Sequence, residues 1–116
     1  MKLRLFCYGL IVFITVSFFS SCQTTAPLYY WGSYETQVYS YLTGENIIPQ
    51  IQALENDLQI ALAEDKQLPP GFFAHLGFLY AEMGNRQKAI EYFNEEKARF
   101  PEAEDFINFV LSRIGA

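Results

Sequence analysis

"FAHLGFLYAEMGNRQKAIEYFNEEKARFP", residues 73–101, predicts two helices joined by a tight turn. Large apolar side chains recur three and four positions apart on both sides of Gly84-Asn85, as they do along one face of a helix. Glycine commonly ends a helix and asparagine commonly begins one, so this pair marks the turn. Gly77 and Ala89 are small, which would let two antiparallel helices approach closely.

The same spacing resembles a tetratricopeptide repeat, a helical hairpin of about 34 residues. The residues that carry the resemblance are Phe73, Leu76, Gly77, Tyr80, Ala89, Phe93 and Pro101. An ordinary helical hairpin with an accidental match is the alternative. Glu96 departs from the pattern, which has a small residue three positions after the aromatic one. The departure predicts that the helix after Pro101 docks differently from a standard repeat.

In this fold the first helices of the repeats line a concave groove, which is used for binding. The resemblance therefore implies a partner-binding groove formed by Ala74, Phe78, Ala81 and Glu82, with His75 at its edge. Phe78 is a large apolar side chain on a face that is usually exposed to solvent in such repeats. Either it belongs to a contact surface, or the segment of residues 31–42 covers it.

Helical patterns continue on both sides of this hairpin. An all-α domain of about five helices is expected, with helices at 33–42, 47–64, 72–83, 86–99 and 101–114, the last as a C-terminal cap. Asn46 and Gly44 mark the turn between the first two. The second helix is expected to have an apolar face formed by Ile48, Ile51, Leu54, Leu58, Ala61 and Leu62. The last helix is expected to have one formed by Phe106, Ile107, Val110, Leu111 and Ile114. The first two helices form either a degenerate first repeat or an unrelated hairpin.

The N-terminus is typical of a secretory signal peptide, with Lys2 and Arg4 before an apolar run at 5–19. That run is shorter than the ~20 residues that span a bilayer. Residues 19–22, Phe-Ser-Ser-Cys, resemble the lipobox of bacterial lipoproteins, although Phe19 replaces the usual leucine. The resemblance implies that residues 1–21 are removed and that Cys22 carries a diacylglycerol and an N-acyl chain such as palmitate. A plain signal peptide, which would leave Cys22 as a free thiol, is the alternative.

Residue 23 is glutamine, whereas lipoproteins kept at the inner membrane usually have aspartate there. The likeness therefore implies an outer-membrane lipoprotein that faces the periplasm. Residues 22–32 then form the lipidated N-terminus and tether, and residues 33–116 form the helical domain. Four residues of the tether, Leu28, Tyr29, Tyr30 and Trp31, are expected either to touch lipid head groups or to pack on the first helix.

Composition argues against several classes of function. The chain has a net charge of −5 at pH 7, and loss of Lys2 and Arg4 makes the domain more acidic still. Nucleic acid, which is recognised through its phosphates, is therefore an unfavourable partner. His75 is the sole histidine and Cys22 is committed to lipid, so no metal site is expected. No serine has a recognisable base, and no cofactor motif occurs. We expect no cofactor and no enzymatic activity.

Three segments resemble a family of small bacterial lipoproteins of unassigned function. They are "PLYYWGSYE", "PPGFFAHLG" and "EKARFPEAEDF", and the likeness runs over residues 28–111. Members of that family tend to be encoded beside two other lipoproteins, one of them similar to the curli secretion channel. The resemblance implies protein partners in the envelope, with that channel-like lipoprotein as a candidate.

The expected function is therefore partner binding by an outer-membrane lipoprotein that assembles or stabilises an envelope or secretion complex. A pilotin-like escort of a channel subunit is a related alternative. A cell-wall enzyme is an alternative of another class.

Overall fold

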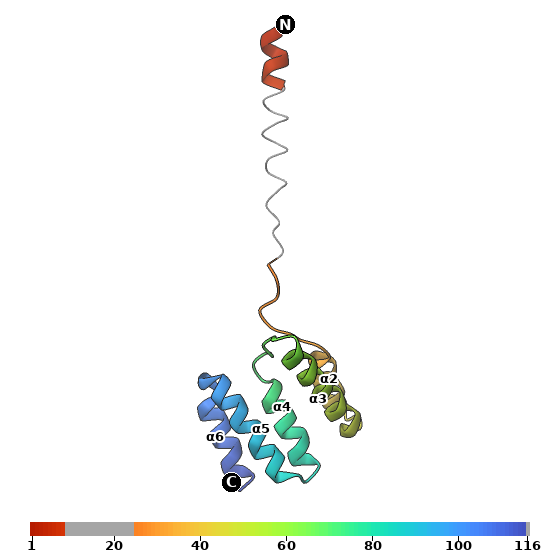
Figure 1. The fold of residues 1–116 in the computed structure, drawn as a ribbon, viewed down its shortest axis with the longest axis vertical. Helices are drawn as coiled ribbons and strands as arrows, with labels where there is room; N and C mark the ends of the chain where they lie inside the picture. The colour runs from red at the N-terminus through yellow and green to blue at the C-terminus, as the bar shows by residue number, and fades with distance from the viewer. Residues whose placement is uncertain (9–24, 116) are drawn as a thin grey trace.

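The computed structural model describes residues 1–8 and 25–115, and every described element of it is helical (Figure 1). The elements of the domain are α2 (Tyr34–Leu42), α3 (Ile47–Ala63), α4 (Phe72–Glu82), α5 (Arg86–Arg99), the short 3-10 helix η2 (Pro101–Ala103) and α6 (Glu104–Arg113). The prediction of an all-α domain is confirmed, and the expected helix ranges agree with these bounds to within one or two residues at most ends.

The predicted lipobox, Cys22 and Gln23 lie outside the described residues. Residues 2–8 are helical. No helix in the two described ranges is both long enough and apolar enough to cross a membrane.

Side chains at the predicted turns hold the helix ends. The Asn46 side chain accepts a hydrogen bond from the Ile48 backbone N–H at 2.9 Å, and Asn85 accepts one from Lys88 N–H at 3.2 Å. Each bond satisfies an N–H that has no partner within its own helix. Gly84 follows α4 with a φ of +84°, a conformation that side chains disfavour. Local signals therefore position the α4–α5 turn as the sequence predicts.

The centre of the domain is α4, which packs most closely against α5. Eight of its eleven residues are buried, among them Phe72, Leu76 and Leu79, each with no exposed area. A methyl group added at Gly77 would lie 2.8 Å from Phe93 Cε1 of α5. Real side-chain carbons do not approach that closely, so the Phe93 ring fills the space that a larger residue would need.

The residues that carry the repeat pattern lie around this contact. Phe73, Leu76, Tyr80, Ala89 and Phe93 are each at most 4% exposed, and Pro101 opens η2.

The α2–α3 hairpin packs beside α4 through fewer buried side chains. Ile51, Leu54 and Ala61 of α3 are buried as expected, whereas Ile48 and Leu62 are 43% and 60% exposed. The expectation that these two residues share one face with Ile51 and Leu54 is wrong. The physical reason is helix geometry, because at about 100° per residue Ile48 and Leu62 point away from the side of α3 that is buried. No residue of α2 itself is buried, so this helix lies at the edge of the domain.

Along the other edge, α6 packs on α5 through one narrow face. Ile107 and Val110 are buried, and Leu111 and Ile114 are half-buried. Phe106 was expected on the same apolar face, but it is 53% exposed. No further described element covers this side of α6, so the apolar face that the sequence suggested is only partly used.

Candidate partner-binding surface

Phe78 of α4 is half-buried, and its ring lies beside aromatic rings of α5 and α6. Its ring meets Phe93 edge-on, with 5.1 Å between ring centroids, and is 6.4 Å from the ring of Phe106. The sequence left open whether Phe78 is exposed or covered by residues 31–42. The aromatic rings beside it belong instead to the two helices that follow it in the chain.

Two phenylalanines of α6 extend this aromatic group to the surface. Phe106 and Phe109 are three positions apart, hence neighbours on the helix, and are 53% and 57% exposed. The Arg113 guanidinium lies over the Phe109 ring at 5.1 Å. We call Phe78, Phe106 and Phe109 the aromatic surface. The sequence predicted Phe106 on the apolar face of the last helix and gave no role to Phe109, whose signal was its position opposite Ile107 on the helix.

The other predicted groove residues on α4 differ in exposure. Ala81 is half-buried and Glu82 is exposed, so both remain open to a partner. Ala74 is only 8% exposed and belongs to the hydrophobic core. Tyr41 of α2 lies close to Glu82, and partial burial, followed by the charge of Glu82, raises the pKa of the Tyr41 hydroxyl.

His75 is buried under α2, not at the edge of an open groove. Its ring packs edge-on against Tyr41 at 5.4 Å and Tyr34 at 6.0 Å, and its Nε2 has no hydrogen-bond partner. Burial lowers the pKa of the imidazole below its usual value, although a hydrogen bond with the Gln37 backbone acts the other way. The neutral ring therefore serves as packing between α2 and α4.

A polar cluster joins α3 to the α4–α5 hairpin. The carboxylate of Glu55 accepts hydrogen bonds from the hydroxyls of Tyr80 and Tyr92 and from the Lys88 ammonium, the last at 3.1 Å. Partial burial acts to raise the pKa of Glu55, but the bonds from Tyr80 and Lys88 outweigh it and leave that pKa lowered. Burial, with the charge of Glu55, raises the pKa of Tyr92 to about 12. Glu55 is thus held ionised.

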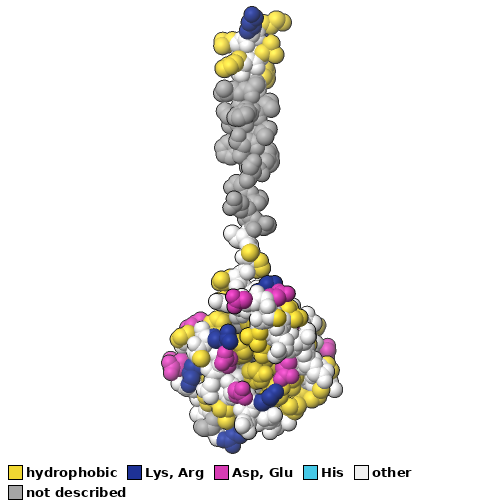
Figure 2. Space-filling model, viewed as in Figure 1, with side chains coloured by type: hydrophobic (Ala, Val, Ile, Leu, Met, Phe, Trp, Pro, Cys, Tyr) yellow, Lys and Arg dark blue, Asp and Glu magenta, His cyan; other side chains and the backbone are white. Residues whose placement is uncertain are grey.

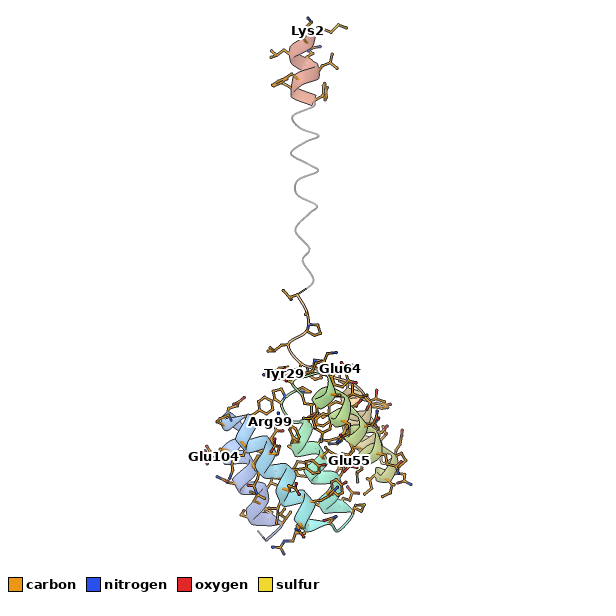
Figure 3. All side chains as sticks on the ribbon, viewed as in Figure 1. Lys2, Tyr29, Glu55, Glu64, Arg99 and Glu104 are labelled. Carbon is orange, nitrogen blue, oxygen red and sulfur yellow. The ribbon has the colours of Figure 1, made fainter. Side chains whose placement is uncertain are left out.

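Stacked rings continue from this cluster. Tyr80 stacks on Tyr92 at 5.5 Å, and Tyr92 stacks on Phe73 at 6.3 Å. The Lys88 ammonium lies 4.6 Å from the centroid of the Tyr80 ring, and the Arg99 guanidinium lies over the Phe73 ring at 4.8 Å. The row is therefore closed by a cation at each end, an arrangement that strengthens packing. Figure 3 labels Glu55 of α3 and Arg99 at the end of α5.

Buried carboxylates hold the first helix of each hairpin. Glu96 of α5 is 2% exposed and accepts hydrogen bonds from the Gly71 and Ala74 N–H groups at the start of α4, at 2.7 and 3.2 Å. Asp57 of α3 accepts the N–H and hydroxyl of Ser33 at the start of α2, at 2.7 and 2.6 Å. A negative charge at a helix N-terminus is favourable.

The departure at Glu96 thus has a structural role. Where a standard repeat has a small residue, this chain has a carboxylate that reaches back to the preceding helix.

Comparison with known protein families gives a match over most of the chain. A family model described as Domain of unknown function (DUF4810) matches residues 28–110, which is most of the chain. The chain belongs to this family. The DUF4810 match begins at Leu28 and so includes the aromatic end of the tether together with α2 to α5 and most of α6. It ends at Val110 and covers Phe78, Phe106 and Phe109.

No curated protein and no solved structure gives a significant match. Within residues 1–8 and 25–115, no three His, Cys, Asp or Glu side chains are grouped so that they could hold a metal ion.

Proposed function

We propose that this protein is an outer-membrane lipoprotein whose tetratricopeptide-like domain binds a protein partner in the periplasm. Binding serves to assemble or stabilise an envelope or secretion complex and involves no chemical reaction. The observation that carries the proposal is the aromatic surface, where two phenylalanines of one short helix stand more than half exposed beside a third. Exposed aromatic clusters of this kind mark protein contact sites.

The correspondence between the two hairpins supports the tetratricopeptide-like arrangement. The same number of positions separates Gly32 from Gly71 as separates Asp57 from Glu96. Both glycines have positive φ and precede the first helix of a hairpin, and both acids bind the start of that helix from the second one. Leu54 and Phe93, both fully buried, stand at equal distances before the two acids. Two units built by one plan are the mark of a repeat.

Short repeats need a cap or a partner to cover their outer faces. In this chain α6 covers part of α5, and the aromatic surface remains open. Arg113 lies over the Phe109 ring, and Glu82 follows Phe78 by one turn of α4. A partner segment that is apolar in the middle and carries charges of both signs at its edges therefore fits this surface. We name the channel-like lipoprotein of the envelope as the first candidate.

Binding to the purified candidate tests the proposal. Phe106→Asp should weaken binding about tenfold or more, because an aromatic contact at the centre of an interface contributes over 1.4 kcal/mol. Tyr39→Asp is the matched control, since Tyr39 is an aromatic residue of α2 that is 66% exposed. It should leave the affinity unchanged.

Photo-crosslinkers at positions 106, 109 and 39 in living cells extend the test to other partners. The first two positions should capture the same envelope protein, and position 39 should not. Equal binding by wild type and Phe106→Asp, with no crosslink at 106 or 109, would contradict the proposed function.

A further inference from the structure

Two residues of the segment that leads into the domain, Tyr29 and Tyr30, pack on the domain beside the loop between α3 and α4. The Tyr30 N–H donates a hydrogen bond to the Gln67 carbonyl at 2.7 Å, and the Lys66 ammonium lies over the Tyr30 ring at 5.4 Å. The Tyr29 ring packs edge-on against Phe100, with centroids 6.4 Å apart. Of the four residues whose position the sequence left open, two therefore pack on the domain.

The other two, Leu28 and Trp31, face outward. Leu28 is 73% exposed, and Trp31 is 43% exposed although its ring stacks on Tyr34 at 6.2 Å. A shallow hollow of about 650 Å³ lies beside them, lined by residues 26–31 and 65–67. Figure 2 shows hydrophobic atoms gathered where the tether meets the domain, with charged side chains next to them.

The distance to the lipid attachment point limits what can cover this end of the domain. Leu28 stands six positions after Cys22. A fully extended chain rises by at most ~3.6 Å per residue, so Leu28 lies within roughly 20 Å of an acylated Cys22. With the lipid inserted in a bilayer, the head-group layer is the nearest surface that Leu28 and Trp31 can meet.

Their chemistry suits that layer. Tryptophan and tyrosine are favoured at the membrane–water interface, and an aliphatic side chain gains by burial among acyl chains. The charges of the α3–α4 connection are Glu64, Asp65 and Lys66, and Lys66 is paired with Glu64 at 2.5 Å. Arg99, which lies beside Gln67, is paired with Glu95 at 2.6 Å. Because both cations are paired, the described residues at this end form no basic patch that would attract anionic lipid.

We propose that Leu28 and Trp31 form a membrane-contact edge that rests the domain on the phospholipid head groups beside its own anchor. This inference rests on the lipid anchor of the proposed function. It adds that the domain has a defined orientation on the membrane and does not hang from a free tether. In that orientation, α4 begins near the bilayer and ends away from it.

Trp31 is the only tryptophan of the chain, so its fluorescence reports on this edge alone. The acylated protein is extracted from membranes and reconstituted into phosphatidylcholine vesicles, with and without brominated phosphatidylcholine. We expect a blue-shifted Trp31 emission and strong quenching by the brominated lipid. The same quenching is expected when phosphatidylglycerol is included, because the contact is apolar.

The matched control moves the fluorophore to the other end of α4. Met83, just past that helix, is 41% exposed, close to the exposure of Trp31. In the double variant Trp31→Phe and Met83→Trp, the emission should not be quenched. The variant Leu28→Asp, which retains Trp31, should lose much of the quenching.

Three outcomes would overturn the contact edge: no quenching of Trp31, equal quenching at positions 31 and 83, or quenching confined to vesicles with phosphatidylglycerol. Mass spectrometry of the same sample shows whether Cys22 is acylated, so failure of the anchor is distinguished from failure of the edge. If Cys22 is unmodified, the Cys7→Ser variant leaves it as the single thiol for coupling to a maleimide phospholipid. The quenching experiment then decides the edge by itself.

Discussion

At the scale of single residues, a few polar side chains at buried positions control how the helices join. Glu96, Asp57 and His75 are 2%, 6% and 8% exposed. Burial of a polar group is costly unless hydrogen bonds replace those with water. The two acids meet this condition with backbone N–H groups, whereas His75 leaves Nε2 without a partner.

Acidification should therefore destabilise the domain through His75. Its pKa is lowered from 6.5 by burial, so below about pH 6.5 the unfolded chain binds a proton that the folded chain does not. Stability present at higher pH is lost as the pH falls toward the folded pKa, by at most about 1.4 kcal/mol per pH unit. Urea unfolding at pH 7.5 and 5.5 measures the loss.

The control for this prediction is His75→Leu, which keeps a buried side chain between Tyr34 and Tyr41 without a titrating group. Its stability should change less over the same range. Glu55 does not contribute in this window, since its lowered pKa places its loss of stability below about pH 4.5. An identical pH dependence in wild type and variant would contradict the role of His75.

At the scale of elements, the two hairpins have the same arrangement of hydrogen bonds at the start of the first helix, but their first helices differ in how many residues are buried. Their first helices, α2 and α4, both receive an acid from the second helix at their N-termini. Most residues of α4 are buried, whereas α2 has no buried residue. Loss of the acid should therefore release α2 locally, while α4 is held by its packing.

Hydrogen exchange of Asp57→Ala and Glu96→Ala tests this difference. Asp57→Ala should speed exchange throughout α2 and leave α4 and α5 nearly unchanged, because Ser33 then loses its acceptor. Glu96→Ala should lower global stability by about 1–3 kcal/mol, because it leaves buried N–H groups without a partner. Asp57→Asn, which keeps an acceptor oxygen, is expected to lie between wild type and Asp57→Ala. Similar exchange rates in α2 for wild type, Asp57→Asn and Asp57→Ala would contradict the prediction.

At the scale of the whole molecule, we propose that one end of the chain anchors the protein to the membrane and that another surface binds the partner. The tether enters beside the α3–α4 loop, where Tyr30 is bonded to Gln67, and the aromatic surface lies on α4 and α6. The membrane-contact edge would limit how the aromatic surface is presented to a partner. Fixing orientation reduces the freedom lost on binding and so favours association.

Metabolic labelling with an alkyne-tagged palmitate tests the anchor. Wild type should be labelled and Cys22→Ala should not, because only a thiol at that position accepts the diacylglycerol. Cys7→Ala is the matched control and should keep the label. Label retained in Cys22→Ala, or lost only in Cys7→Ala, would contradict the lipoprotein assignment.

Much of the fold could be predicted because helix boundaries depend on local chemistry. Asn46 and Asn85 bind backbone N–H groups two and three residues away, Gly84 adopts a positive φ, and Pro101 stops α5. Each of these effects acts within one turn of helix, so it can be read along the chain. Close contact at Gly77 was likewise predicted from residue size, which leaves room for Phe93.

The tertiary structure decided which apolar side chains are covered and which backbone and side-chain groups the acidic residues bind. Ile48, Leu62 and Phe106 belong to apolar patterns with three- and four-residue spacing, but the way the helices pack leaves them 43%, 60% and 53% exposed. Glu55 and Glu96 look like ordinary surface acids in the sequence, yet they join helices distant along the chain. The sequence by itself determined the helices and their ends, since those depend on near neighbours. Coverage and long-range hydrogen bonds depend on how whole helices pack, and only the folded chain brings those groups together.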